Sequence, residues 1–183
     1  MEQIQTINSN DFKAFQSFAR KFIMFERTPI PNSFIAKVQE SAINKLGLKN
    51  INQLRDRFEG QAFMDKKTLI FVGLFTLEKY LNSTFIQSPL NLEESQDLCK
   101  IKYKEKTYRI VPFIFGRLPI LTNECKEPLI FCAVQPNFKS ASIYGVLKDY
   151  NFSDNNLFSN KTNNPINIGF KFIGFNSLEN LAK

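Results

Sequence analysis

Apolar residues recur every three or four positions near the start of the chain, which is the spacing of one helix face. Ser9, Asn10 or Asp11 can act as the N-cap. The apolar positions that follow are Phe12, Phe15, Phe18, Ala19, Phe22 and Ile23. This pattern predicts an amphipathic helix whose phenylalanines pack in the core, because phenylalanine is usually buried. The two prolines of "RTPIPN" end the helix.

A second helix is predicted to begin at Asn32 or Ser33 and to end at Gly47, which supplies a left-handed stop. The segment from about Asp65 to Leu81 fits either a buried strand or a helix that is apolar all round, since "TLIFVGLFTL" has no polar side. The length of the segment and its tail, "LEKYL", favour a buried helix.

Beyond a polar segment around Ser88 to Ser95, the pattern changes to short runs that are typical of strands. These runs are "LCKIKY", "TYRIVPFIF", "PLIFCAVQ", "SASIYGVL" and "FKFIGF". Short connections between successive strands predict an antiparallel meander. We therefore expect an α+β protein in which a helical part, residues 1–88, packs with an antiparallel β-sheet part, residues 89–183, as one compact unit.

The stretch from Lys148 to Gly169 is rich in asparagine and serine and interrupts the predicted sheet as a long loop. Long loops inside compact domains are often functional, so this loop is a candidate contact with a partner. Its apolar residues Phe152, Leu157 and Phe158 are the candidate protein-contact residues. The alternative is that these three side chains fold the loop back onto the core.

The first predicted hairpin, "CKIKYKEKTYRI", carries a series of basic residues. Its candidate polyanion contacts are Lys100, Lys102, Lys104, Lys106 and Arg109. Alternation along a strand places the first three lysines on one face, with Arg109 on the opposite face. A turn at about Lys104 to Lys106 brings Tyr103 near Tyr108 as a cross-strand pair.

Two interpretations of this hairpin remain open. Lysines and an exposed tyrosine on a sheet face can bind the phosphates and bases of a nucleic acid. Lysines on a sheet face or edge are also an ordinary means of keeping strands soluble. The net charge of +7 is spread over both halves of the chain and the hairpin contains a single arginine, so the solvated face is the favoured interpretation.

The composition excludes most of the common catalytic sites. The chain has no histidine, so it lacks Ser-His and Cys-His dyads and histidine metal ligands. The cysteines have no CxxC spacing and no glycine-rich phosphate loop is present, so we expect no cofactor, no metal and no enzymatic activity. A metal-dependent nuclease built on Glu124, Lys126 and Asp97 is a remote alternative, because the first two fall in a predicted loop.

Cysteine usage and the N-terminus indicate the compartment. Cys99, Cys125 and Cys132 are an odd number, which argues against a disulfide framework and favours a reducing environment. The segment "MEQIQTINSND" has no charged-then-apolar leader, and the longest apolar run is shorter than the ~20 residues of a membrane span. We therefore expect a cytoplasmic protein with no membrane partner.

Three stretches of the chain follow one another in an informative order, namely "TLIFVGLFTLEKYLN", "LCKIKYKEKTYRIVPF" and "EPLIFCAVQPNFKSASIYGVL". Together with Ala133–Gln135, Ile143–Leu147 and Ser177–Leu181, this order resembles an uncharacterised cyanobacterial protein family of unknown function, over roughly residues 65–183. In that family a helix ending in a hydrophobic-Tyr-Leu stretch precedes a small β-domain. The resemblance implies a bacterial, cyanobacterial or plastid-like, cytosolic setting and brings no activity, cofactor or catalytic residue.

These observations predict a non-catalytic protein-interaction or accessory module of a bacterial cytosolic assembly, which binds another protein or its own copy. The alternative is a nucleic-acid-binding accessory protein that uses the basic hairpin. An enzyme ranks third.

Overall fold

The structure is a computed structural model in which residues 9–47, 58–87, 90, 99–122, 125–164 and 167–181 are described. The helices are α1 (Ser9–Met24), α2 (Asn32–Lys45), α4 (Phe58–Leu81) and the short 3-10 helix η2 (Phe175–Ser177). The strands are β1 (Thr28–Pro29), β2 (Lys100–Tyr103), β3 (Lys106–Ile114), β4 (Ile120–Leu121), β5 (Leu129–Val134), β6 (Ser140–Leu147), β7 (Phe158–Asn164) and β8 (Asn167–Phe172). The predicted α+β class is confirmed.

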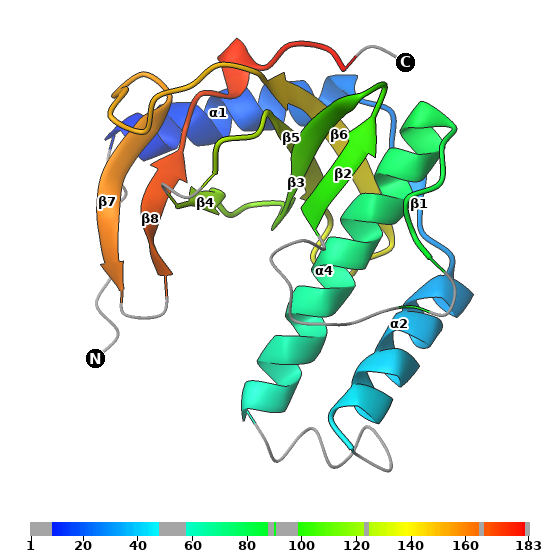
Figure 1. Cartoon of the computed structure of the whole chain (residues 1–183). Coiled ribbons are helices and arrows are strands. Elements are labelled where there is room, and N and C mark those ends of the chain that lie inside the picture. Colours follow the sequence, from blue (N-terminus) through cyan, green and yellow to red (C-terminus); the bar gives the residue numbers. More distant parts are fainter. Residues whose placement is uncertain are drawn as a thin grey trace.

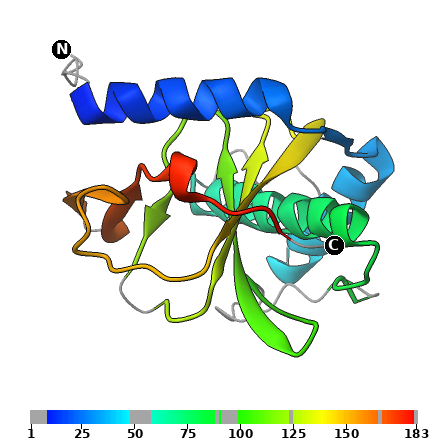
Figure 2. The same cartoon turned by 90° about the horizontal axis from the view of Figure 1, so that it is seen from above.

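A five-stranded sheet in the order β1-β6-β5-β3-β2 forms the centre of the molecule, and a three-stranded sheet in the order β4-β8-β7 lies beside it (Figure 1). Helix α4 packs on one face of the large sheet, and α2 packs against α4 on that side. Helix α1, η2 and the small sheet pack on its other face, and α1 runs along the outside of the molecule (Figure 2). The large sheet therefore separates two hydrophobic cores.

Strand β5 shows how one sheet serves both cores. All of Leu129–Val134 is buried. Alternate side chains of a strand point to opposite faces, so Ile130 and Cys132 enter the core beneath α4 while Phe131 and Ala133 enter the core beneath α1. Each core also takes side chains from both the helical part and the β part of the chain. A strand that is apolar on both sides fits the centre of a sheet that is covered twice.

The buried helix predicted from about Asp65 to Leu81 is confirmed as the larger part of α4. The helix packs against α2 on one side and against β3, β5 and β6 on another, which explains why it is apolar nearly all round. Where α4 crosses β3, a Cβ placed on Gly73 would lie 2.9 Å from the Cβ of Pro112. Glycine at this point lets the helix approach the sheet closely.

The antiparallel meander predicted for the β part is wrong at one pair of strands. β3 and β5 are parallel, with Arg109 opposite Leu129 and Ile114 opposite Val134. The other pairs of the large sheet are antiparallel. After β3 the chain leaves the large sheet, adds β4 to the small sheet and then returns to the end at which β3 began. The sequence does not predict this change of sheet, because β4 has two residues and so gives no strand pattern.

The loop predicted from Lys148 to Gly169 is wrong in its second half, where β7 and β8 pair as an antiparallel hairpin. Asparagine has a low strand propensity, and pairing with β4 in the small sheet overrides it. At the other end of the chain, Thr28 and Pro29 add β1 to the edge of the large sheet. Proline is tolerated there because an edge strand forms ladder hydrogen bonds on one side alone.

Candidate functional site

Strands β2 and β3 form the predicted basic hairpin, with a two-residue turn at Lys104 and Glu105. The turn residues have φ angles of 45° and 63°, as in the type I′ turns that match the twist of antiparallel strands. The prediction assigns one residue more to this turn. A one-residue change of register moves the side chains of a strand to the other face, so the turn decides where each cation lies.

The register separates the candidate cations of the hairpin. Lys100 lies directly opposite Arg109, and directly opposed residues share a face of the sheet. The prediction that Arg109 lies on the face away from the lysines is therefore wrong. Lys106 is opposite Tyr103 on the other face, and Lys104 is in the turn. These five positions do not form one continuous basic stripe.

The carboxylate of Glu127 lies between two of these cations. It is 3.0 Å from Nζ of Lys100 and 3.7 Å from Nε of Arg109. The hydrogen bond from Lys100 is the main cause that lowers the pKa of Glu127 to about 2. The ionised carboxylate neutralises part of the basic surface. Lys100 is itself exposed, as are Lys102, Lys104 and Lys106.

The tyrosines of the hairpin face the core beneath α4. Tyr103 and Tyr108 are half-buried and pack against that core. Tyr103 pairs across the hairpin with Lys106, so its predicted pairing with Tyr108 is wrong. Its ring instead contacts Phe85, with the ring centroids 6.4 Å apart. A ring that is held in this way is not presented for stacking on a base.

The three candidate contact residues of the long polar stretch are packed inward. Leu157 and Phe158 are 8% and 2% exposed and belong to the core beneath α1. The half-buried ring of Phe152 lies 4.9 Å from that of Phe158 and 5.7 Å from that of Phe170. Leu157 and Phe158 therefore pack on the core, as in the alternative that the loop folds back, and contact of this loop with a partner stays a prediction.

Little catalytic chemistry converges in the part of the chain that the structure describes. No group of three or more cysteine or acidic side chains that could hold a metal occurs there. Asp97 and Glu124 of the nuclease alternative lie outside the described residues. The three cysteines form no disulfide. Burial raises the pKa of Cys99 and raises that of Cys132 to about 12, so neither thiol is a ready nucleophile at neutral pH.

A groove of about 630 Å³ opens where the chain between α1 and α2 passes the C-terminal end of α4. The rings of Phe25, Phe75 and Tyr80 line it. The Tyr80 hydroxyl donates a hydrogen bond of 3.2 Å to the carbonyl of Leu181, and Nζ of Lys79 lies 5.4 Å from the centre of the Phe75 ring. These contacts hold two of the lining side chains in place. The lining as a whole also includes Glu26 and Arg27, and it does not select one class of ligand.

Helix α1 presents one side to solvent, which we call the outer face of α1. Phe12 and Ile23 on this face are 55% and 82% exposed. The described part of the chain exposes one further large apolar side chain, that of Ile120 at 41%. The apolar stripe predicted as core is thus divided, because Phe18 is buried while Phe12 and Ile23 are not. Among the α1 side chains that the structure describes, the exposed ones that make up the outer face are Phe12, Lys13, Gln16, Ala19, Arg20 and Ile23.

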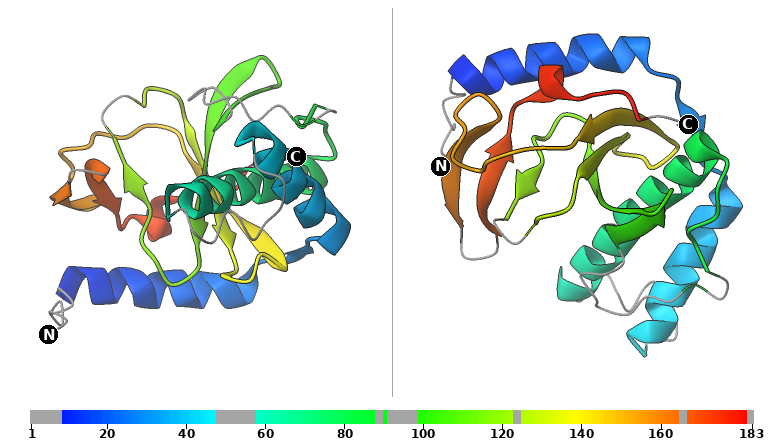
Figure 3. Two further views of the ribbon diagram at one scale, coloured as in Figure 1. Left: turned by 90° about the horizontal axis from the view of Figure 1, so that it is seen from below. Right: turned by 45° about the horizontal axis from the view of Figure 1, so that its top comes forward.

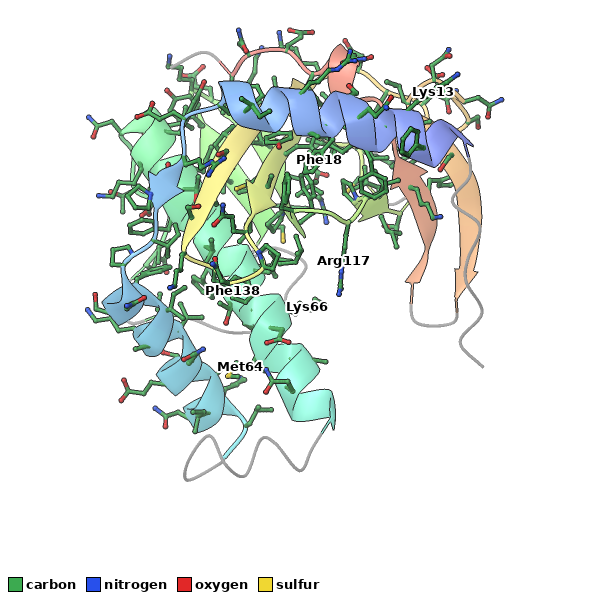
Figure 4. All side chains as sticks on the ribbon, turned by 180° about the vertical axis from the view of Figure 1, so that it is seen from behind. Lys13, Phe18, Met64, Lys66, Arg117 and Phe138 are labelled. Atoms are coloured by element: carbon green, nitrogen blue, oxygen red, sulfur yellow. The ribbon has the colours of Figure 1, made fainter. Side chains whose placement is uncertain are left out.

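The position of Phe18 explains the division. Its ring contacts four aromatic rings at centroid distances from 4.9 to 5.6 Å, those of Phe113, Phe115, Tyr144 and Phe175. Figure 4 shows Phe18 beneath α1 and Lys13 on the side away from the sheets. In both views of Figure 3, α1 lies along the margin of the molecule, with the other helices and strands on one side of it. One edge of the stripe is therefore buried, and the other edge faces outward.

Comparison with known proteins adds no identification. No protein-family model, curated protein or solved structure matches the chain. The resemblance to cyanobacterial proteins therefore stays a prediction. None of the helices among the described residues is both long and apolar enough to cross a membrane. The function has to be argued from the surface of the molecule itself.

Proposed function

We propose that this chain is a non-catalytic protein-interaction module of a bacterial cytosolic assembly and that it binds another protein through the outer face of α1. The observation that supports the proposal is the exposure of Phe12 and Ile23 on one side of one helix. Leaving apolar surface in water costs about 25 cal/mol for each Å². A partner that covers both side chains removes this cost. Partner binding therefore explains these two apolar residues, whereas packing within the monomer does not.

The attachment of α1 suits it to this role. Phe18 anchors the helix in the aromatic cluster, and the Ser17 hydroxyl donates a hydrogen bond of 2.5 Å to Oδ1 of Asn176 in η2. The opposite side of the helix therefore needs no rearrangement before a partner binds. A surface that is already ordered loses less conformational entropy on binding than a flexible segment does.

Light scattering of the purified chain, followed by capture from extracts of the native host, tests this proposal. We expect a defined partner or a defined oligomer whose formation depends on Ile23. A protein that is strictly monomeric and recovers no partner would refute the proposal.

A second candidate function is nucleic-acid binding by the hairpin. It is supported by the exposure of Lys102, Lys104 and Lys106 at one end of β2 and β3. If it is correct, affinity for RNA or DNA falls steeply with salt, and replacing the three lysines by glutamate abolishes binding. The absence of any mobility shift with either nucleic acid at low salt would end this alternative.

A further inference from the structure

The outer face of α1 has the spacing of a coiled-coil seam. Phe12, Gln16, Ala19 and Ile23 follow one another at intervals of four, three and four residues, which is the alternation of d and a positions in a heptad repeat. At 3.6 residues per turn, the four side chains fall within an arc of about 60°. All four are exposed, while the core holds Phe18 on the opposite side. The seam is thus complete on α1 and has no partner helix among the described residues.

The residues beside this seam are basic. Lys13 and Arg20 directly follow the d positions Phe12 and Ala19, so both occupy e positions and lie on the same flank, seven residues apart. Both side chains are exposed. In coiled coils, the charges at the e and g positions set the choice of partner, because each one faces a flanking residue of the other helix. Cations here favour carboxylates on the partner.

We propose that the outer face of α1 binds an amphipathic helix of another protein, one with an apolar seam and with glutamate or aspartate at the positions that flank it. This inference rests on the proposed function and names the class of partner. Phe12 and Ile23 supply the two large apolar contacts, and Ala19 between them permits close approach of the helices. Gln16 is a polar residue at an a position, which can fix the register of the pair.

A second copy of the chain fits this face less well. The positions that flank the seam are Lys13 and Arg20 on one side and Phe15 and Phe22 on the other, so a copy supplies no carboxylate in either orientation. An antiparallel pair also places the basic flanks of the two copies against each other. The whole chain carries a charge of +7, which adds to the repulsion.

An anionic membrane also fits this face less well than an acidic helix does. A helix that lies in a bilayer surface needs an apolar face at least about 100° wide. The seam of α1 is narrower, and Gln16 interrupts it near its centre. Its width matches the contact between two helices.

Two synthetic peptides about three heptads long test the inference. Both have leucine and isoleucine in the seam; one has glutamate at every flanking position and the other has lysine. Binding of each labelled peptide to the full chain is measured by fluorescence anisotropy. The third probe is a vesicle of phosphatidylcholine and phosphatidylserine, and binding of the chain to it is measured separately. The variants are Ile23→Glu in the seam, the pair Lys13→Glu and Arg20→Glu on the flank, and Ile120→Glu as a matched exposed apolar control on β4. Circular dichroism checks that each variant is folded.

We expect the acidic peptide to bind the wild type and Ile120→Glu equally, and to bind Ile23→Glu at least about tenfold more weakly. The flank pair should reverse the preference in favour of the basic peptide. Equal binding of both peptides by the wild type, or no binding of either, overturns the inference, as does binding of the vesicles in place of the acidic peptide. If the wild type binds neither peptide but self-associates, and Ile23→Glu abolishes this self-association, the outer face of α1 binds a second copy. That result also overturns the inference. If a host partner is still captured through Ile23, the proposed function stands and the stated class of partner alone fails.

Discussion

Lys100 lies directly opposite Arg109 across the β2–β3 hairpin, and both cations reach the same carboxylate, that of Glu127. Glu127 belongs to the connection that leads into β5, so the ion pairs tie this connection to the base of the hairpin. A charge-rich stretch that suggests a polyanion site in the sequence is thus, in part, a structural ion-pair group. The other exposed cations of this stretch lie toward the tip of the hairpin.

Replacing Glu127 by glutamine should lower the free energy of unfolding at neutral pH by about 1 kcal/mol or less, because the ion pairs are partly exposed. The folded-state pKa of Glu127, about 2, lies below the ordinary value of 4.5. A depressed carboxyl pKa adds stability above the ordinary value, and this stability is lost as the pH falls from about 4.5 toward about 2. Urea unfolding across this range should show the wild type and the variant converging. A constant difference down to the lowest pH would contradict the assignment.

Two phenylalanines of α1 should respond differently to truncation. Phe18→Ala removes a side chain that contacts four aromatic rings and should cost about 3–5 kcal/mol of unfolding free energy. Phe12→Ala removes an exposed ring on the same helix and should change that free energy by about 0.5 kcal/mol or less. Chemical denaturation of both variants measures the contrast. Similar losses from the two would show that Phe12 also packs in the core.

Alanine at Gly73 should destabilise the protein, although alanine is the better helix former by about 1 kcal/mol. The added Cβ would lie 2.9 Å from the Cβ of Pro112 on β3, which forces α4 away from the sheet. Overpacking of this kind costs about 1–3 kcal/mol, so we expect a net loss of about 1 kcal/mol. Thermal unfolding checks the sign. A higher melting temperature for Gly73→Ala would show that the helix lies farther from β3.

The hydroxyl of Tyr144 is buried and, among the described residues, has no hydrogen-bond partner. Burial also raises the pKa of Tyr144. Tyr144→Phe should therefore be neutral or stabilising, by about 1 kcal/mol at most. The matched control is Tyr150→Phe, because the Tyr150 hydroxyl lies 3.1 Å from the carbonyl oxygens of both Cys125 and Glu127, and its loss should cost about 1 kcal/mol. If Tyr144→Phe destabilises as much as the control does, its hydroxyl has a partner.

The elements that the sequence predicts well are those with strong local signals. The apolar length of α4 and the presence of a hairpin near Lys104 are each visible in a single segment, although the turn is one residue shorter than predicted. The parallel pairing of β3 with β5 and the hairpin of β7 and β8 depend on β4, two residues that join a separate sheet. A contact between distant segments of this kind leaves no pattern within either segment.

The outer face of α1 could have been predicted from the sequence. The spacing of Phe12, Gln16, Ala19 and Ile23 is present there, but Phe15, Phe18 and Phe22 form a stronger stripe beside it. The two stripes together are wider than the part of a helix that one core can bury, and the structure shows which edge is buried. The width of an apolar stripe therefore carries information that its periodicity does not.

The most direct test of the account is quantitative capture from host extract with three forms of the chain: the wild type, Ile23→Glu and Ile120→Glu. The account predicts that the wild type and Ile120→Glu recover the same partner in equal amounts, and that recovery with a folded Ile23→Glu falls at least about tenfold. Equal recovery with all three forms would contradict the claim that the outer face of α1 is the binding surface.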